Sequence, residues 1–147
     1  GRENVFLSGA ILGMSQREIA ARLNRIIDFA EISDAIDTPV KRYSSGMTAR
    51  LAFSVAAHLD AEIMLVDEVL AVGDTAFKTK CLDAMRSLAR SGRSIVFVSH
   101  ELDMLERLCD RAILLDHGRI LADGEPGALV GMHRNDVDAA DTEEIPA

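Results

Sequence analysis

Several residue types that indicate particular classes of protein are scarce in this chain of 147 residues. It has two cysteines, Cys81 and Cys109, and no CxxC motif, which argues against a disulfide framework or a cysteine zinc site. Tryptophan is absent and tyrosine occurs once, so no aromatic platform for stacking bases is evident. The longest run without a charged residue, Asn4 to Gln16, has 13 residues, which is too short to span a bilayer.

Positive charge is scarce as well. The 16 Lys and Arg residues are outnumbered by 24 Asp and Glu residues, and the formal net charge is −8. An acidic chain without a basic cluster binds phosphate backbones poorly, so we expect no nucleic-acid partner. Apolar residues, by contrast, make up 48% of the chain, which predicts a folded domain with a substantial core.

Residues 1–60 carry apolar side chains at helical spacing. The predicted helices cover 3–12, 16–31 and 46–59, with a short turn of helix over 33–37. A capping box marks the start of the second helix, because the Ser15 hydroxyl can accept from the amide of Glu18 and the Glu18 side chain can reach back. Ser44-Ser45-Gly46 stands at the start of the third.

The pattern changes after residue 60. The predicted elements are buried parallel strands at 63–66 and 94–99, helices over 75–90 and 101–109, strands at 112–115 and 120–122, and a last helix with Pro126 in its first turn. His117-Gly118 suits a hairpin turn between the last two strands. The predicted fold class is α/β, with a helical part at 1–60, an α/β part at 61–133 and an acidic tail or linker at 134–147.

Three groups of polar residues lie where an α/β fold binds ligands. Asp67-Glu68 closes one apolar strand, His100 follows the next, and Ser44-Ser45-Gly46 opens a helix with free backbone N–H groups. One carboxylate can hold Mg²⁺ through water, and the second can activate a water for attack on a phosphate. The histidine, the serine hydroxyls and the amides can bind phosphate oxygens, so the set matches the needs of phosphoryl transfer.

Each group also has an ordinary structural explanation. Asp-Glu after an apolar run is often a strand reaching solvent, and a histidine after a strand is more often a helix cap or a surface residue. Ser-Ser-Gly before a helix is first of all an N-cap. The order and spacing of the three groups together favour the functional explanation.

Four motifs resemble, in order, those in the second half of an ABC-transporter nucleotide-binding domain. Tyr43-Ser44-Ser45-Gly46-Met47 resembles the LSGGQ signature, and the sequence IMLVDE at 63–68 resembles Walker B with its following glutamate. Ala71-Val72-Gly73-Asp74 stands where the D-loop stands, and His100 resembles the switch histidine. The resemblance covers residues 1–125 and implies part of a P-loop NTPase (RecA-like) core together with the ABC helical subdomain.

The particular residues within the motifs resemble those of one group within this family. Most other ABC proteins have Gly in place of Ser45, Gln in place of Met47 and Pro in place of Val69. These departures, with the opening Gly1-Arg2-Glu3-Asn4-Val5, are similar to the ATPases that export bacterial cell-surface polysaccharides of the O-antigen, teichoic acid and capsule types. The resemblance implies a peripheral protein on the cytoplasmic face of a bacterial membrane, with a transmembrane permease and a second nucleotide-binding subunit as partners.

The resemblance also implies a role for each site residue, with ATP and Mg²⁺ as cofactors. Asp67 would hold Mg²⁺ through water, Glu68 would be the general base, and His100 would contact the γ-phosphate. Ser44-Ser45-Gly46 would cap the γ-phosphate of an ATP held by the partner subunit. Asp74 would couple the two ATP sites of the dimer.

The chain contains no GxxxxGK[ST] phosphate loop, whose lysine and hydroxyl residue bind phosphate and Mg²⁺. In the family, the strand before that loop lies between the strands predicted at 94–99 and 112–115, so its absence would leave two unpaired edges. We therefore expect a longer intact protein to be the active ATPase. We expect this chain alone to bind Mg-ATP poorly and not to hydrolyse it.

Two other functions fit parts of the sequence. An ABC ATPase without a transporter, acting in translation or DNA repair, would share the motifs, but such proteins usually carry paired domains or long insertions. A non-catalytic interaction module would account for the missing phosphate loop, although the acid pair and His100 argue for an active intact protein.

Overall fold

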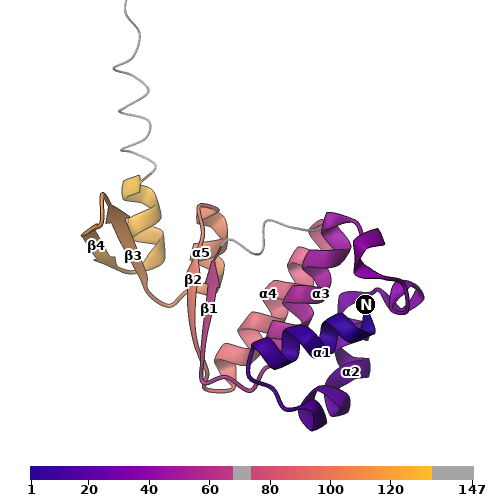
Figure 1. Cartoon of the computed structure of the whole chain (residues 1–147). Helices are drawn as coiled ribbons and strands as arrows, with labels where there is room; N and C mark the ends of the chain where they lie inside the picture. The colour runs from indigo at the N-terminus through magenta and orange to yellow at the C-terminus, as the bar shows by residue number, and fades with distance from the viewer. Residues whose placement is uncertain (68–73, 134–147) are drawn as a thin grey trace, which may run out of the picture. The chain divides into compact units, whose positions relative to one another are not determined.

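The computed structural model describes residues 1–67 and 74–133 (Figure 1). The chain divides into two compact units, Gly1–Val96 and Phe97–Ala147. The first unit holds α1 (Arg2–Ile11), α2 (Gln16–Ala30), α3 (Ser45–Ala57), β1 (Ile63–Asp67), α4 (Thr75–Arg90) and 3-10 turns at Ser33–Ala35 and Val40–Arg42. The strand β2 (Ser94–Val98) crosses the boundary, and the second unit holds α5 (Leu102–Leu108), β3 (Ala112–Asp116), β4 (Arg119–Gly124) and a helix over 126–133.

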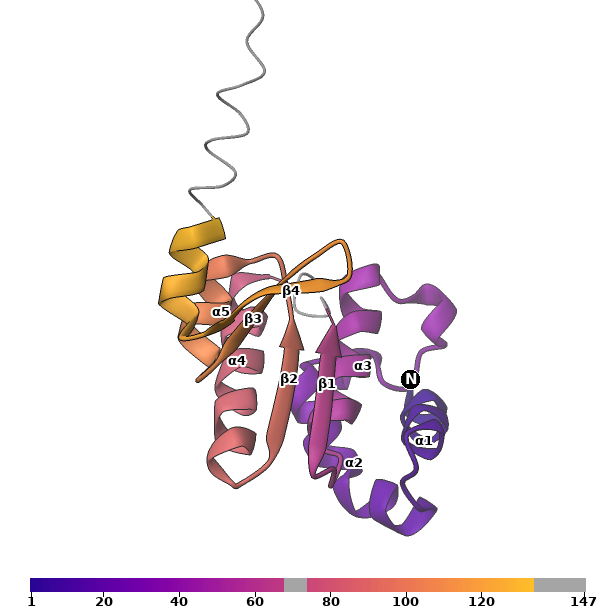
Figure 2. The same ribbon diagram turned by 90° about the vertical axis from the view of Figure 1, so that its left-hand side faces the viewer.

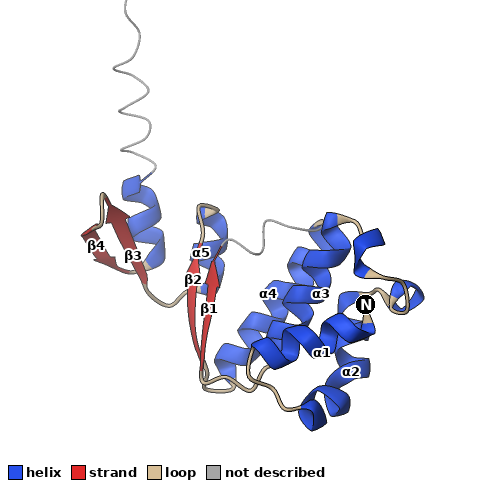
Figure 3. Ribbon diagram, in the orientation of Figure 1, coloured by secondary structure: helices blue, strands red, loops and turns tan. Residues whose placement is uncertain are grey.

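The order of elements confirms the mixed α/β class. Helices and loops make up the chain before Ile63, and strands alternate with helices after it (Figure 3). The bounds of the helices and strands from α1 to β4 lie within two residues of the predicted ones. The 3-10 turn at Val40–Arg42 is not predicted by the sequence pattern. The division between units falls at 96/97, and a division at residue 60 stays a prediction.

The helices α1, α2 and α3 pack on one another around an apolar core. The core side chains with no exposed surface come from all three helices: Val5, Ile19, Ile26, Ala30 and Val55. The predicted capping box is confirmed, because the Ser15 hydroxyl accepts from the Glu18 amide at 3.3 Å and Glu18 Oε2 accepts from the Ser15 amide at 2.8 Å. The first sixty residues therefore contain a core of their own, as the helical spacing predicts.

The strands β1 and β2 pair in a two-stranded sheet and run in the same direction (Figure 2). The parallel pairing is as predicted, but the prediction that both faces of these strands are buried is wrong for the described residues. Met64 and Val66 of β1 are buried, whereas Ile63 and Leu65 are 68% and 71% exposed. The physical reason is that the first unit covers only one face of β1, so alternate side chains of this strand reach solvent.

The strands β3 and β4 form the predicted antiparallel hairpin in the second unit. Asp116 pairs with Arg119, which leaves a loop of two residues, His117 and Gly118. Both have positive φ, at 44° and 76°, as a two-residue hairpin turn of the I′ type requires. Glu125 then accepts hydrogen bonds from the amides of Gly127 and Ala128 at the start of the last helix.

Candidate functional site

Ser44 caps the start of α3, the helix that carries the signature-like motif. Its hydroxyl accepts a hydrogen bond from the Met47 amide at 3.1 Å, and its carbonyl accepts from the Thr48 amide at 3.0 Å. The amides of Ser45 and Gly46 fall in the first helical turn, where no intrahelical acceptor exists. Ser44 and Ser45 are exposed, so two amides and two hydroxyls lie at the positive end of the helix dipole, where anions bind.

Ser45 occupies its position without backbone strain. Among the described residues other than glycine, only Glu31 and His117 have positive φ. Ser45 is instead the first residue of a right-handed helix, which a side chain tolerates well. Gly46 is also helical, and a Cβ there would meet the Ser44 hydroxyl only at an ordinary contact distance of 3.8 Å. The serine in place of the usual glycine is therefore compatible with the local fold.

The segment before α3 is tied to the start of α1. The Tyr43 hydroxyl donates to the Ala35 carbonyl at 2.8 Å, and a Cβ on Gly1 would overlap that hydroxyl. The Arg2 amide also donates to the Ile36 carbonyl at 2.9 Å. Because Tyr43 directly precedes Ser44, these contacts fix the approach of the chain to the start of α3.

The predicted strand-end residues lie at strand ends where they are described. Asp67 is the last residue of β1 and is exposed, and His100 follows β2 by two residues and is exposed. Asp67 belongs to the first unit and His100 to the second. Glu68, the predicted general base, lies outside the described residues, as do Ala71, Val72 and Gly73.

A magnesium site with several protein ligands is not formed by the part of the chain that the structure describes. No group of three or more His, Cys, Asp or Glu side chains in those residues could hold a metal ion. Mg²⁺ commonly keeps several waters and needs only one or two carboxylates. An exposed aspartate at a strand end, as Asp67 is, has the oxygen chemistry for such water-mediated binding.

Asp74 is engaged within its own chain. Its Oδ1 accepts from the Phe77 amide at 2.9 Å, so Asp74 is the N-cap of α4. Its Oδ2 pairs with the Arg50 guanidinium of α3 at 2.5 Å. The Phe77 N–H, and then Arg50, hold the pKa of this carboxyl below its usual value. The structure therefore brings Asp74 together with the helix that begins at Ser45.

Sequence reasoning did not single out Arg50, although a signal was present. Arg50 is the only charged residue of α3, in a helix otherwise made of apolar and small polar residues. A single arginine four residues after Gly46 could have predicted an ion pair with a neighbouring helix. Its two carboxylate partners could not have been identified, because they lie 19 and 24 residues away in the sequence.

The described cysteines are poor nucleophiles. Cys81 is buried, which raises the pKa of its thiol to about 12, and burial also raises the pKa of Cys109. Both are free thiols. Because a thiol that stays protonated is a poor nucleophile, we expect both cysteines to be inert at neutral pH.

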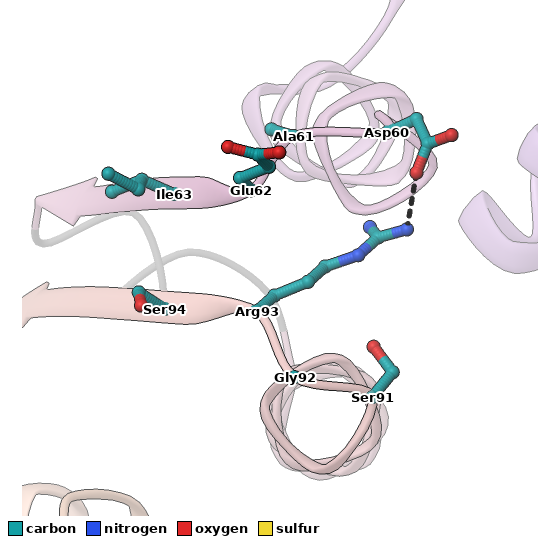
Figure 4. A pocket seen from close by; sticks show the side chains of 8 residues that line it. All are labelled: Asp60, Ala61, Glu62, Ile63, Ser91, Gly92, Arg93 and Ser94. Carbon is teal, nitrogen blue, oxygen red and sulfur yellow. Dashed lines mark hydrogen bonds and ion pairs between the residues drawn. The ribbon is translucent and has the colours of Figure 1, made fainter.

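An open depression lies at the other end of β1 and β2, before the two strands begin (Figure 4). Its volume is about 450 Å³. The Arg93 guanidinium beside it donates to Asp60 at 2.8 Å and to the Leu59 carbonyl at 2.7 Å, so its charge is neutralised. Ligands of parallel sheets bind at the carboxyl ends of strands, and none of the predicted site residues lines this depression.

The chain resembles several curated bacterial proteins along most of its length. It is 55% identical over 130 residues to the ABC transporter protein AbcA of Aeromonas salmonicida, covering 88% of this chain and 42% of that protein. It is 45% identical to the O-antigen export system ATP-binding protein RfbB of Myxococcus xanthus, covering 97% of this chain and 33% of that protein. It is 44% identical to the teichoic acids export ATP-binding protein TagH of Lactiplantibacillus plantarum, covering 91% and 37%.

The fold has a counterpart among solved structures. An ATP-binding subunit of an ABC transporter matches with a TM-score of 0.77 and 23% identity, covering 90% of this chain and 55% of that one. No protein-family model matches the chain. Within the described ranges, none of the helices has the length and apolar content needed to cross a bilayer.

The chain spans less than half the length of these three curated relatives. Nearly all of its own length is nevertheless matched, at identities between 44% and 55%. Along most of its length the chain is therefore similar to one part of the ATP-binding proteins of O-antigen and teichoic acid export, and its fold is similar to that of an ABC ATP-binding subunit.

Proposed function

We propose that this chain is part of the ATP-hydrolysing subunit of a bacterial ABC transporter that exports a cell-surface polysaccharide. The observation that carries the proposal is the similarity to ATP-binding proteins of O-antigen and teichoic acid export along at least 91% of the chain. The names of these relatives also favour a transporter over a non-transporter ABC ATPase.

We propose for the site residues the ATP-contacting roles that the resemblance to ABC proteins implies, and the positions of the described ones support the proposal. Ser44-Ser45-Gly46, at the exposed start of α3, supplies amides and hydroxyls for the γ-phosphate of an ATP held by a second subunit. Asp67, at the exposed end of β1, binds Mg²⁺ through water, and Glu68 takes a proton from the attacking water. His100 contacts the γ-phosphate, and Asp74 couples the two sites of the dimer.

The partners and the location follow from the same proposal. The working unit is a dimer of ATP-binding subunits joined to a transmembrane permease, at the cytoplasmic face of the membrane. The subunit itself is held there by the permease, and we expect it to sediment with membranes only when the permease is co-expressed. Recovery in the membrane pellet without the permease would contradict this arrangement.

The chemical role is tested by Glu68→Gln in the full-length subunit. Removal of a general base lowers kcat by roughly 100-fold or more, and ATP binding is retained, so ATP-bound dimers accumulate. The measurements are steady-state phosphate release and size-exclusion chromatography with Mg-ATP. The matched control is Glu62→Gln, at the opposite end of β1 beside the depression, which we expect to leave kcat within about twofold. An ordinary rate in Glu68→Gln would overturn the assignment.

The chain on its own supplies a second test. Because it contains no phosphate loop, we expect the purified 147-residue chain to release no phosphate from Mg-ATP above the level of a buffer control. Measurable turnover by this chain, abolished by Glu68→Gln, would show that the phosphate loop is dispensable.

A further inference from the structure

Arg50 joins three elements of the first unit around one guanidinium group. Its Nη1 donates to Glu31 Oε2 at 3.0 Å, at the C-terminal cap of α2. Its Nη2 donates to Asp74 Oδ2 at 2.5 Å, at the N-terminal cap of α4. Its guanidinium carbon lies 4.7 Å from the ring centroid of Phe77 in the first turn of α4, a cation–π arrangement.

The contacts continue beyond Arg50 into a charge chain of four residues, Asp74–Arg50–Glu31–Lys80. Lys80 Nζ donates to Glu31 Oε1 at 2.8 Å and lies 4.9 Å above the ring of Phe29. The two carboxylates alternate with the two cations, so every neighbour along the chain is of opposite sign. Glu31 sits at φ 57°, a left-handed conformation that is costly for a side chain, which indicates that its surroundings hold it there.

An aromatic cluster from the same helices supports the charge chain. The rings of Phe29 on α2, Phe53 on α3 and Phe77 on α4 have centroids between 5.9 and 6.4 Å apart. Such ring pairs prefer particular distances and orientations. The three helices are therefore fixed to one another both by apolar contact and by directed charge.

An ordinary surface ion pair would not fix the relative position of two helices, since exposed pairs contribute little to stability. Arg50 differs because its side chain is only 18% exposed and because its two nitrogens serve carboxylates from two different helices. A lysine presents a single ammonium on a flexible stem and cannot reproduce a planar fork stacked on a ring. The geometry therefore demands arginine and specifies the position of α3 relative to α4.

The location of Arg50 connects this device with the proposed ATP site. It lies four residues after Gly46, a rise of about 6 Å along α3. Its partner Asp74 caps α4, which begins at Thr75. One bridge therefore links the helix that presents Ser44-Ser45-Gly46 to the residue assigned to coupling between sites.

We propose that Arg50 is a positioning residue of the ATPase, a role that rests on the function proposed above. It fixes the position of the Ser44-Ser45-Gly46 start of α3 relative to the Asp74 cap of α4. Both then meet the ATP of the partner subunit as a single rigid surface. In this arrangement Asp74 acts through α3 and α4, because its two oxygens are engaged within its own subunit.

The experiment compares Arg50→Met with Arg86→Met in the full-length subunit. Arg86 is a matched control because it lies on α4 and pairs with Asp83 of the same helix at 3.3 Å. We expect Arg50→Met to lower kcat by about 10- to 100-fold, as small misplacements of reacting groups do. The affinity of the monomer for a fluorescent ATP analogue stays within about twofold of the unsubstituted protein, and the control changes neither quantity.

Two further measurements separate positioning from general damage. Arg50→Lys preserves the charge and is expected to fold. We expect its kcat to lie between those of the unsubstituted subunit and Arg50→Met, because a lysine can pair with only one of the two carboxylates. We expect the double variant Arg50→Met with Asp74→Asn to have a kcat at most about twofold below that of the slower single variant, because both substitutions break the same ion pair. Amide exchange at Met47 and Phe77 is expected to rise together in Arg50→Met.

The outcomes that overturn the inference are distinct from those that overturn the proposed function. If the unsubstituted subunit hydrolyses ATP but Arg50→Met matches Arg86→Met, positioning by Arg50 is wrong. The positioning role is equally wrong if the fold reductions in kcat of the two single variants multiply in the double variant. It is also wrong if the amide exchange rate of Phe77 is unchanged in Arg50→Met. If the unsubstituted full-length subunit hydrolyses no ATP, the proposed function itself is wrong, and with it any catalytic role for Arg50.

Discussion

The helices α2 and α3 and the strands of this chain differ in how completely they bury their large apolar residues, whereas α1 buries Val5 but leaves Leu7 and Ile11 58% and 76% exposed. Val5, Ile19, Ile26 and Val55 of the helices have no exposed surface. In the strands, Leu65 of β1, Leu115 of β3 and Ile120 of β4 are all more than 60% exposed.

The difference shows that apolar periodicity and burial are separate properties. A helix needs one apolar stripe, and its neighbours in this chain supply the surface that covers it. A parallel strand has two faces to cover, and the described chain covers only one face of β1. Since the chain spans only part of the length of the curated relatives that it matches, we expect another part of a longer protein to cover the second face.

The largest effect that the comparison predicts is in the helical core. Ile26→Ala removes a fully buried side chain from the contact between α2 and its neighbours, and we expect the chain to lose about 3 kcal/mol of unfolding free energy. Urea unfolding followed by circular dichroism measures it. Leu65→Ala is the contrasting change in the same chain, and because Leu65 is mostly exposed its expected cost is below about 0.5 kcal/mol. Equal losses would contradict the contrast.

The same leucine sharpens the comparison in the full-length subunit. If the exposed face of β1 is covered there, Leu65→Ala removes a buried side chain and costs about 2 kcal/mol, against almost nothing in the 147-residue chain. The measurement is the change in urea midpoint of each protein on making this one substitution. A small change in both would show that this face of β1 remains in solvent, and the inference of a covering segment would be wrong.

A smaller effect is expected at the start of α2. Ser15→Ala removes one half of the capping box and leaves the Glu18 amide without its acceptor, at a cost of about 1 kcal/mol. Urea unfolding of the chain measures it, with Ser8→Ala on α1 as a serine control away from a helix start. A loss no larger than that of the control would show that the Ser15 cap is not formed in solution.

The fold was largely predictable because its signals are local. The capping box at Ser15, the spacing of Ile19 and Ile26, and the two-residue turn at His117-Gly118 depend on residues close in sequence. The exposed face of β1 was not predictable, because whether a strand face is covered depends on what lies against it. A run such as 63–66 has the same composition in either case.

The candidate site was predictable only in part. The N-cap at Ser44 is local and is confirmed, and the placement of Asp67 at a strand end follows from where the apolar run stops. The bridge from Arg50 to Asp74 and Glu31 was missed, since it joins residues far apart in sequence through tertiary contacts. The chemical roles came from the resemblance to ABC proteins, because spacing and composition do not identify ATP.

The smallest expected effect tests the charge chain by pH. Hydrogen bonds from Lys80, and then from Arg50, hold the pKa of Glu31 below its ordinary value. A carboxyl with a lowered pKa in the folded state stabilises the fold fully above its unfolded pKa of about 4.3, and this contribution is lost as pH falls through the folded value. We therefore expect the stability of the chain to fall less steeply between about pH 5 and pH 3 in Glu31→Gln than in the unsubstituted chain. The difference is small because Glu31 is exposed and screened by solvent.

Urea midpoints at pH 7, 5, 4 and 3 measure this difference in stability, with Glu3→Gln on α1 as the control. Parallel pH profiles for Glu31→Gln and the unsubstituted chain would show that the exposed half of the charge chain is not formed in solution, and would leave Arg50 with Asp74 as its only carboxylate partner.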